Sequence, residues 1–249
     1  MSCIDKRAVV TGGLGGIGTA ICQRLSQAGA KVIATCHPGE IDQIDAWVQA
    51  QQDKGAKICV VAGDVSTAEG GAALIGKIVE QFGTVDILVN CAGITRDTTL
   101  KKMTAEQWDA VIDTNLSSVF YVTQPVWNGM IERGFGRVIN ISSVNGQRGQ
   151  FGQTNYAAAK AGMHGFTMAL AYEGAAKGVT VNTVSPGYID TAMTAAMRGE
   201  IREAILAGVP MRRMGTPEEI AHAVVFLADD ASSYITGANL PVNGGLFMH

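Results

Sequence analysis

The 249-residue sequence predicts an α/β fold in which helices cover both faces of one parallel sheet. Seven short apolar segments alternate with helical ones along the chain, and each apolar segment has the length of a buried strand. A glycine-rich turn directly follows the first of them. Because no linker, repeat or low-complexity segment interrupts the alternation, residues 1–249 are predicted to form a single domain with a Rossmann-like, doubly wound parallel sheet.

The chain opens with a predicted strand over residues 7–11, and a helix is predicted over 19–27. Between them lie glycines with the spacing G-x-x-x-G-x-G. Such glycines let the backbone approach a diphosphate, and the start of the following helix favours negative charge. The alternative is a tight connection that serves close helix packing. The dinucleotide interpretation assigns the turn contacts to Gly12, Gly15, Gly16, Ile17 and Gly18.

The later elements continue the same alternation. Strands are predicted at 31–34, 58–61, 86–90, 137–141, 179–184 and 239–242, and helices at 41–54, 72–82, 108–130, 156–176 and around 218–227. Ligands of such folds bind beyond the carboxyl ends of the strands, which meet at one rim of the sheet. The residues expected on that rim are Gly12, Asp64, Asn90, Ser143 and Pro186.

Tyr156 and Lys160 stand four residues apart in an alanine-rich segment, so a helix would present both on one face. An ammonium beside a phenol favours the phenolate and lowers the pKa of the tyrosine from about 10. Such a tyrosine can exchange a proton with a carbonyl or alcohol oxygen near neutral pH. Taken alone, this spacing also arises by chance on helices.

Composition and charge narrow the class of protein. The net charge of −3, with no basic block, gives no support for a nucleic-acid surface. The five cysteines include no CxxC pair, so neither a disulfide framework nor a metal site is indicated. No apolar run approaches the roughly 20 residues that cross a bilayer, and the start of the chain lacks the pattern of a signal peptide. We therefore expect a cytoplasmic protein without a membrane partner.

Several motifs together resemble the short-chain dehydrogenase/reductase family over nearly the whole chain. They are the glycine turn after Thr11, Asn90-Cys91-Ala92-Gly93, Asn115, Ser143, Tyr156-x-x-x-Lys160 and Pro186-Gly187. Within the family, segments 94–97, 141–156 and 243–245 are most similar to the acetoacetyl-CoA reductases of polyhydroxybutyrate synthesis. Cys91 stands where the family usually has a second asparagine, and we expect it to alter hydrogen bonds of the loop near the cofactor.

The resemblance implies reduction of acetoacetyl-CoA to (R)-3-hydroxybutyryl-CoA by a homotetramer that uses a nicotinamide cofactor. Tyr156 would protonate the alkoxide, and Ser143 would hydrogen-bond the carbonyl oxygen. Lys160 would lower the pKa of Tyr156 and hold the nicotinamide ribose, while Asn115 would support a water path that returns protons. Viewed singly, Ser143 could instead cap the turn after its strand, and Asn115 could be a buried polar residue bonded to the backbone.

Two other functions fit parts of the pattern. A 3-oxoacyl-carrier-protein reductase of fatty-acid synthesis would use the same chemistry on another carrier, but the loop Gln150-Phe151-Gly152-Gln153 favours coenzyme A. A non-catalytic NAD(H)-sensing protein would keep the dinucleotide scaffold alone. The intact Ser143, Tyr156 and Lys160 argue against that last interpretation.

The loop after the second strand bears on the choice of cofactor. No cation lies between Lys31 and Lys54, whereas Glu40 and Asp42 would repel the 2′-phosphate of NADPH. We therefore expect NADH, with either acid accepting from the ribose hydroxyls, although His37 could tolerate NADPH. The alternative is that these acids only begin a solvated helix. The other cofactor contacts implied by the resemblance are Asp64, Val65, Asn90, Ala92, Gly93, Tyr156, Lys160, Pro186, Gly187 and Ile189.

Substrate recognition is expected in the loop before Tyr156 and in a lid around residues 188–212. Lys101, Lys102 and Arg148 are available for coenzyme A phosphates, although exposed cations are most often plain surface. An apolar helical stripe in the lid segment comprises Met193, Met197, Ile201, Ile205 and Leu206, which could equally be ordinary core packing. By resemblance, the acetoacetyl and pantetheine path is lined by Asp97, Lys102, Gln150, Phe151, Gln153 and Tyr188.

Overall fold

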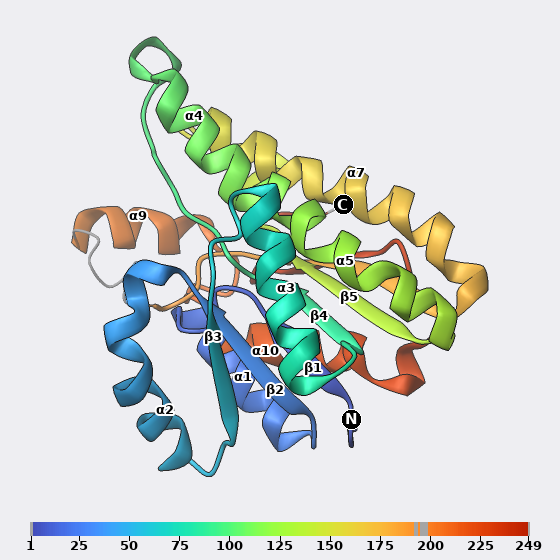
Figure 1. Cartoon of the computed structure of the whole chain (residues 1–249). Coiled ribbons are helices and arrows are strands. Elements are labelled where there is room, and N and C mark those ends of the chain that lie inside the picture. Colours follow the sequence, from blue (N-terminus) through green and yellow to red (C-terminus); the bar gives the residue numbers. More distant parts are fainter. Residues whose placement is uncertain (1, 192–193, 195–198, 249) are drawn as a thin grey trace.

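The computed structural model describes residues 2–191, 194 and 199–248. Within them, one parallel sheet has the strand order β3-β2-β1-β4-β5-β6-β7 (Figure 1). The predicted fold class and all seven predicted strands are confirmed. The strands are β1 (Arg7–Val10), β2 (Lys31–Cys36), β3 (Ile58–Ala62), β4 (Ile87–Asn90), β5 (Gly136–Ile141), β6 (Val179–Pro186) and β7 (Asn239–Val242).

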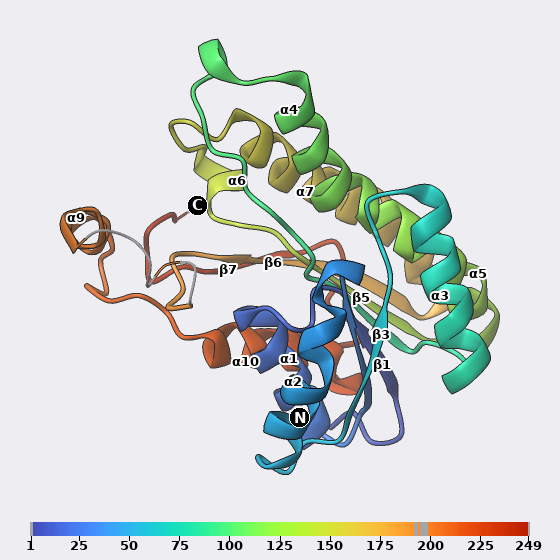
Figure 2. The ribbon, with the colours of Figure 1, turned by 60° about the vertical axis from the view of Figure 1, so that its left-hand side comes forward.

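Helices cover both faces of the sheet, as two views show (Figure 1, Figure 2). One layer contains α1 (Gly16–Gln27), α2 (Ile44–Gln52) and α10 (Pro217–Ala228). The other contains α3 (Ala68–Phe82), α5 (Ser118–Arg133) and α7 (Thr154–Gly174), with α4 (Ala105–Ile112) beside α7. The helix α9 (Gly199–Gly208) lies outside both layers. Shorter helical pieces are Pro38–Gln43, Leu100–Lys102, α6 (Asn145–Arg148), Ala175–Lys177 and Asp230–Ser232.

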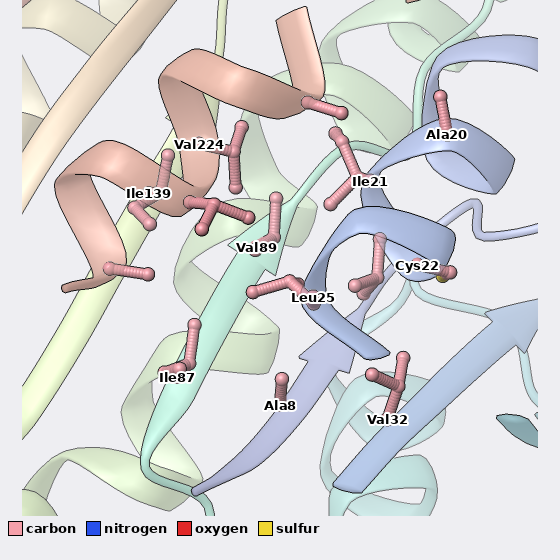
Figure 3. Close-up of a cluster of buried hydrophobic side chains, with 14 of the residues drawn as sticks. Ala8, Ala20, Ile21, Cys22, Leu25, Val32, Ile87, Val89, Ile139 and Val224 are labelled. Atoms are coloured by element: carbon pink, nitrogen blue, oxygen red, sulfur yellow. The ribbon is translucent and has the colours of Figure 1, made fainter. Parts of the chain in front are cut away.

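The two layers enclose two apolar cores. In the first, Leu25 of α1 and Val224 of α10 pack together over Val89 of β4 (Figure 3). In the second, Leu88 of the same strand packs with Ile78 of α3. Neighbouring strand residues serve opposite cores because successive side chains point to opposite faces of a sheet. Both faces are buried, which explains why the strands read as continuous apolar runs.

The helix predicted over 108–130 is two helices, α4 and α5, joined by a π-helical stretch Asp113–Ser117. Asn115 lies in this stretch with its side chain fully buried. A π-helical turn holds one more residue than an α-helical turn and is frequent at functional sites. The apolar pattern continues across it, so periodicity alone did not reveal the insertion.

Other helix boundaries moved by a few residues. The predicted helix 41–54 begins as the 3-10 turn Pro38–Gln43, and that predicted over 19–27 begins at Gly16. Part of the predicted lid stripe, Met193 and Met197, lies outside the described residues. Ile205 and Leu206 fall in α9.

Candidate active site

Three of the predicted catalytic residues meet at the carboxyl ends of the strands. Ser143 follows β5, and Tyr156 and Lys160 occupy the first two turns of α7. The Lys160 Nζ lies 5.7 Å from the centroid of the Tyr156 ring, and it donates a hydrogen bond to the Ile141 carbonyl at 2.7 Å. The Ser143 side chain lies close enough to the Tyr156 phenol to lower its pKa as a hydrogen-bond partner. Helix spacing and the strand end therefore bring the three side chains together.

Burial dominates the ionisation of this site. It raises the pKa of Tyr156 to about 12, while the hydrogen bond from Ser143 lowers that pKa and the negative charge of Asp97 raises it further. Burial lowers the pKa of Lys160 to about 8. The expectation that Lys160 depresses the pKa of Tyr156 therefore needs correction. In this structure desolvation outweighs charge effects, and Ser143 is the group that favours the phenolate.

Asn115 clamps the loop that follows β4. Its Oδ1 accepts from the Ile94 N–H at 2.8 Å, and its Nδ2 donates to the Ile94 carbonyl at 2.9 Å. A Cβ placed on Gly93 would lie 3.3 Å from the Asn115 Oδ1 and 3.5 Å from the Lys160 Nζ. The side chain thus bonds to backbone, as the structural alternative predicted, and it also places the loop next to Lys160. The water path through Asn115 stays a prediction.

The glycine turn fits a dinucleotide diphosphate. A Cβ on Gly18 would lie 2.2 Å from the Gly12 carbonyl oxygen, and one on Gly12, whose φ is +62°, would lie 2.9 Å from the Ala92 Cα. Both positions therefore require glycine. No side chain caps the start of α1, where Gly15 and Gly16 are exposed. Backbone N–H groups and the helix dipole there favour an anion.

The loops after β2 and β3 lie on the same side of the rim as the glycine turn. The Glu40 carboxylate accepts from the His37 N–H at 2.9 Å, and the His37 Nδ1 accepts from the Gly39 N–H at 3.0 Å. This capping box agrees with the alternative interpretation, in which Glu40 only caps the start of a helix. Asp42 is exposed. Hydrogen bonds from the backbone and hydroxyl of Ser66 lower the pKa of Asp64, helped by nearby His37, while the next residue, Val65, is buried.

The side chain of Asn90 turns away from the rim. Its Nδ2 donates to the Asn140 Oδ1 at 2.8 Å and to the Thr123 Oγ1 at 3.2 Å, between the sheet and the helix layer of α5 and α7. Only the backbone of Asn90 therefore remains at the expected ligand position. The N–H groups of Cys91 and Ala92 both donate to the Thr11 Oγ1 at 3.0 Å. This pair of bonds anchors the loop beside the glycine turn.

The segment after β6 joins the site from the other side. The Pro186 carbonyl accepts from the Val144 N–H at 2.8 Å, next to Ser143. Gly187 donates to the Val242 carbonyl at 2.9 Å, and Ile189 is buried. The three expected cofactor contacts thus lie at and just beyond the end of β6, and Pro186 is held next to the segment of Ser143.

The predicted substrate residues fall into separate groups. Gln150 and Tyr188 line a pocket of about 470 Å³, together with Arg148, Glu200, Ala204, Ile205, Gly208 and Leu246. Asp97 and Gln153 instead bond to each other, with Nε2 to Oδ2 at 2.7 Å. Phe151 is 87% exposed, and Lys102 lies on the exposed turn Leu100–Lys102. Neither of the last two is among the described residues that line the pocket.

Sequence reasoning missed two polar residues that build the site. Asn155 is fully buried, and its Nδ2 donates to the carbonyls of Arg96 at 3.3 Å and Gln107 at 3.1 Å. Asn145 is buried and donates to the Gln153 side chain at 2.9 Å. Both stand beside residues that the motifs had singled out, which was the available signal. Their partners are distant in sequence and could not be read from spacing.

The described part of the chain shows neither a membrane span nor a metal-binding cluster. No helix there is long and apolar enough to cross a membrane. The described residues also contain no group of three or more His, Cys, Asp or Glu side chains arranged to hold a metal ion.

Fold and site together define a class of protein, a dinucleotide-dependent oxidoreductase with a Ser143, Tyr156 and Lys160 centre. A family model described as "Enoyl-(Acyl carrier protein) reductase" matches residues 12–247. The chain belongs to the short-chain dehydrogenase/reductase family, and a nicotinamide cofactor follows from that membership.

Individual relatives cover the chain almost completely. It is 64% identical to an acetoacetyl-CoA reductase of Allochromatium vinosum, over 97% of this chain and 98% of that protein. Identity to an acetoacetyl-CoA reductase of Cupriavidus necator is 53%, over 98% and 99% of the two chains. A 3-oxoacyl-(acyl-carrier-protein) reductase of Escherichia coli is 48% identical over 100% of both chains.

Proposed function

We propose that the protein reduces acetoacetyl-CoA to (R)-3-hydroxybutyryl-CoA in the cytoplasm, as a step of polyhydroxybutyrate synthesis. The observation that carries the chemistry is the placement of Ser143 and buried Lys160 beside Tyr156. Relatives named acetoacetyl-CoA reductase at 64% and 53% identity support the substrate. The pocket that contains Arg148 offers a path and a cation for the coenzyme A arm.

In the reaction, the hydroxyl groups of Ser143 and Tyr156 both act on the carbonyl oxygen of the substrate. When bound, the nicotinamide supplies a hydride to the carbonyl carbon. Ser143 donates a hydrogen bond to the carbonyl oxygen, and Tyr156, whose raised pKa keeps it protonated near neutral pH, transfers its proton to that oxygen. Lys160, with a pKa of about 8, is mostly charged at pH 7 and can return a proton toward Tyr156. A donor aimed at the developing charge contributes several kcal/mol to the transition state, on the order of 3.

We infer a preference for NADH over NADPH. Glu40 and Asp42 place carboxylates in the loop after β2, and this loop has no lysine or arginine that could bind a 2′-phosphate. Because one carboxylate oxygen of Glu40 is engaged by the His37 N–H, exposed Asp42 shares the role of ribose acceptor.

Steady-state kinetics with acetoacetyl-CoA test both proposals. Reduction with NADH at a higher kcat/KM than with NADPH is expected. No turnover with either cofactor would refute the proposed function. Turnover with a preference for NADPH would refute only the inference about the loop and would assign the phosphate to His37 or to backbone N–H groups.

A 3-oxoacyl-carrier-protein reductase remains the second candidate, since relatives of that name are 48% identical to the chain. The same assay with acetoacetyl-carrier protein decides between them. A much higher kcat/KM on the carrier protein would replace the coenzyme A assignment. A sensor that binds NAD(H) without turnover would show cofactor binding and no reduction of either thioester.

We also propose that residues 188–212 form a lid and that the assembly is a homotetramer. The lid is supported by the α9 residues Ala204, Ile205 and Gly208, which line the pocket of Arg148. The tetramer is supported by exposed apolar side chains on opposite layers, including Phe120 of α5 and Phe226 of α10. Two separate self-complementary faces are what a homotetramer built as a dimer of dimers requires.

A further inference from the structure

Asn145 connects the catalytic serine to a distant carboxylate. Its backbone N–H donates to the Ser143 Oγ at 3.1 Å. Its side-chain Nδ2 donates to the Gln153 Oε1 at 2.9 Å, and the Gln153 Nε2 donates to the Asp97 Oδ2 at 2.7 Å. The Ser143 side chain in turn lies close enough to the Tyr156 phenol to lower its pKa. Hydrogen bonds therefore connect Asp97 through Gln153 to the Asn145 side chain, and the Asn145 backbone N–H reaches the Ser143 hydroxyl; we call this set of contacts the Asp97 relay.

The carboxylate fixes the direction of the two side-chain amide bonds in the relay. An ionised Asp97 can only accept, so Gln153 must present its NH2 group to it and its oxygen to Asn145. Asn145 must then present its own NH2 group to Gln153. Its Oδ1 is buried and has no hydrogen-bond partner among the described residues, a condition that costs stability. The orientation of the Asn145 amide thus satisfies the bond to Gln153 and leaves the Asn145 Oδ1 without a partner among the described residues.

Two segments carry the relay, the loop around Asp97 and the loop around Gln153, and hydrogen bonds join them on both sides of these residues. The Thr98 N–H donates to the Gly152 carbonyl at 2.9 Å, and the Asn155 Nδ2 donates to the Arg96 carbonyl at 3.3 Å. These bonds flank Asp97 on one segment and Gln153 on the other. The carboxylate is therefore held in place although it is exposed.

We propose that Asn145 is a positioning residue for carbonyl reduction. Its N–H occupies a lone pair of the Ser143 Oγ, so the single hydroxyl proton of Ser143 is directed away from Asn145, toward Tyr156 in the free protein and toward the carbonyl oxygen when substrate is bound. The Asp97 relay holds the backbone of Asn145 in the position that allows this bond. The inference rests on the proposed function, because the oxygen that Ser143 addresses is that of the substrate.

A double-mutant cycle tests the link to Ser143. Asn145→Ala should lower kcat between about twofold and tenfold, the range that corresponds to one hydrogen bond, with little change in the KM for NADH. In the Ser143→Ala background the same substitution should have no further effect, because its target is gone. An equal loss in both backgrounds would overturn the proposal. Gln147→Ala is the matched control, since Gln147 lies on the same short helix and its Oε1 has no partner among the described residues.

Reversing the relay gives a second test that does not need activity. Asn145→Asp alone sets a carboxylate against the Gln153 Oε1 and should lower the melting temperature and kcat more than Asn145→Ala does. Adding Asp97→Asn lets Gln153 turn around and donate to residue 145, so the double variant should recover the melting temperature lost in the single one. A double variant no more stable than Asn145→Asp would overturn the relay. If the wild-type protein failed to reduce acetoacetyl-CoA, the proposed function would be refuted. The melting temperatures of these variants would still test the relay.

The pH profile supplies a readout that a purely structural role would not move. In the direction of alcohol oxidation, activity rises as Tyr156 loses its proton. Weaker orientation of Ser143 removes a hydrogen bond that favours the phenolate, so Asn145→Ala should move the rising limb to higher pH. Gln147→Ala should leave the limb in place. An unmoved limb in Asn145→Ala would contradict the positioning role.

Discussion

Lys160 is an ionisable residue that is only 4% exposed. Burial lowers its pKa from an ordinary 10.5 to about 8, which means that the charged form is less favourable in the folded protein than in the unfolded chain. Between these two values the unfolded chain binds more protons, so stability rises with pH across that window. The buried lysine therefore costs stability at neutral pH, as is common for functional sites.

Lys160→Met should abolish turnover and raise the free energy of unfolding at pH 7 by up to about 3 kcal/mol, since each pKa unit corresponds to about 1.4 kcal/mol. The Ile141 carbonyl loses its partner in this variant, which reduces the gain. Calorimetry at pH 7 and pH 10 is the measurement. The advantage over the wild type should shrink at pH 10, where folded Lys160 is already neutral, and an advantage that grew with pH would contradict the assignment.

Tyr156→Phe removes only the phenolic oxygen. Reduction of acetoacetyl-CoA should fall by at least about a hundredfold, the usual scale of a general acid, while NADH binding measured by fluorescence titration is retained. Tyr172→Phe is the control because Tyr172 lies on the same helix and is 90% exposed. Near-normal turnover in Tyr156→Phe would remove this residue from the mechanism.

Glu40→Arg should shift cofactor preference toward NADPH by roughly 1.5 to 3 kcal/mol, the value of one charge-assisted pairing. That corresponds to about tenfold or more in the ratio of kcat/KM values. The substitution also removes the cap on the His37 N–H, so melting temperatures should be compared. Asp45→Arg, an exposed site in the first turn of α2, is the matched control. An equal shift in both variants would mean that only general charge matters.

Residue spacing together with the family resemblance was enough to single out Ser143, Tyr156 and Lys160, and the structure brings them together because a strand end and a helix face fix where those side chains go. It was not enough for Asn90, whose side chain enters a buried polar network, or for Asn145, whose partner lies eight residues away across a turn. The pKa of Tyr156 could not be read from Lys160 alone either. It depends on how much water the fold excludes.

Among the elements, the turn at the start of α1 has the strictest requirement for particular residues. Two glycines are required there because the turn and the helix touch each other and the loop after β4. The π-helical stretch around Asn115 shows the opposite case. Its inserted residue leaves the apolar pattern intact, and the clamp on Ile94 that it permits exists only in the folded chain.

Gly18→Ala should therefore weaken NADH binding strongly and destabilise the protein, because the new Cβ would lie 2.2 Å from the Gly12 carbonyl oxygen. Gly76→Ala is the matched control within a helix. Its Cβ would have no atom within 4 Å, so the substitution should stabilise the protein by about 1 kcal/mol through helix propensity. Isothermal titration and thermal melts measure the two effects. Unchanged NADH affinity in Gly18→Ala would refute the role of this turn.

At the scale of the whole molecule, the exposed apolar residues of the two helix layers predict how copies assemble. Light scattering should give four times the 26.0 kDa chain mass. Phe120→Glu on α5 and Phe226→Glu on α10 should each reduce the particle to a dimer, because each places a charge in a different apolar contact. Lys77→Glu on α3 serves as a charge control. A wild-type monomer would refute the tetramer.

The packing of α1 against α10 has a consequence for how the chain is made. Ile21 and Leu25 leave the ribosome among the first helical residues, whereas Val224 and Leu227, which share their apolar core, emerge close to the end of synthesis. β1 likewise pairs with β4, about eighty residues further along. The nascent chain therefore holds an uncovered apolar helix through most of translation, and a polypeptide released early would expose the surface that chaperones bind.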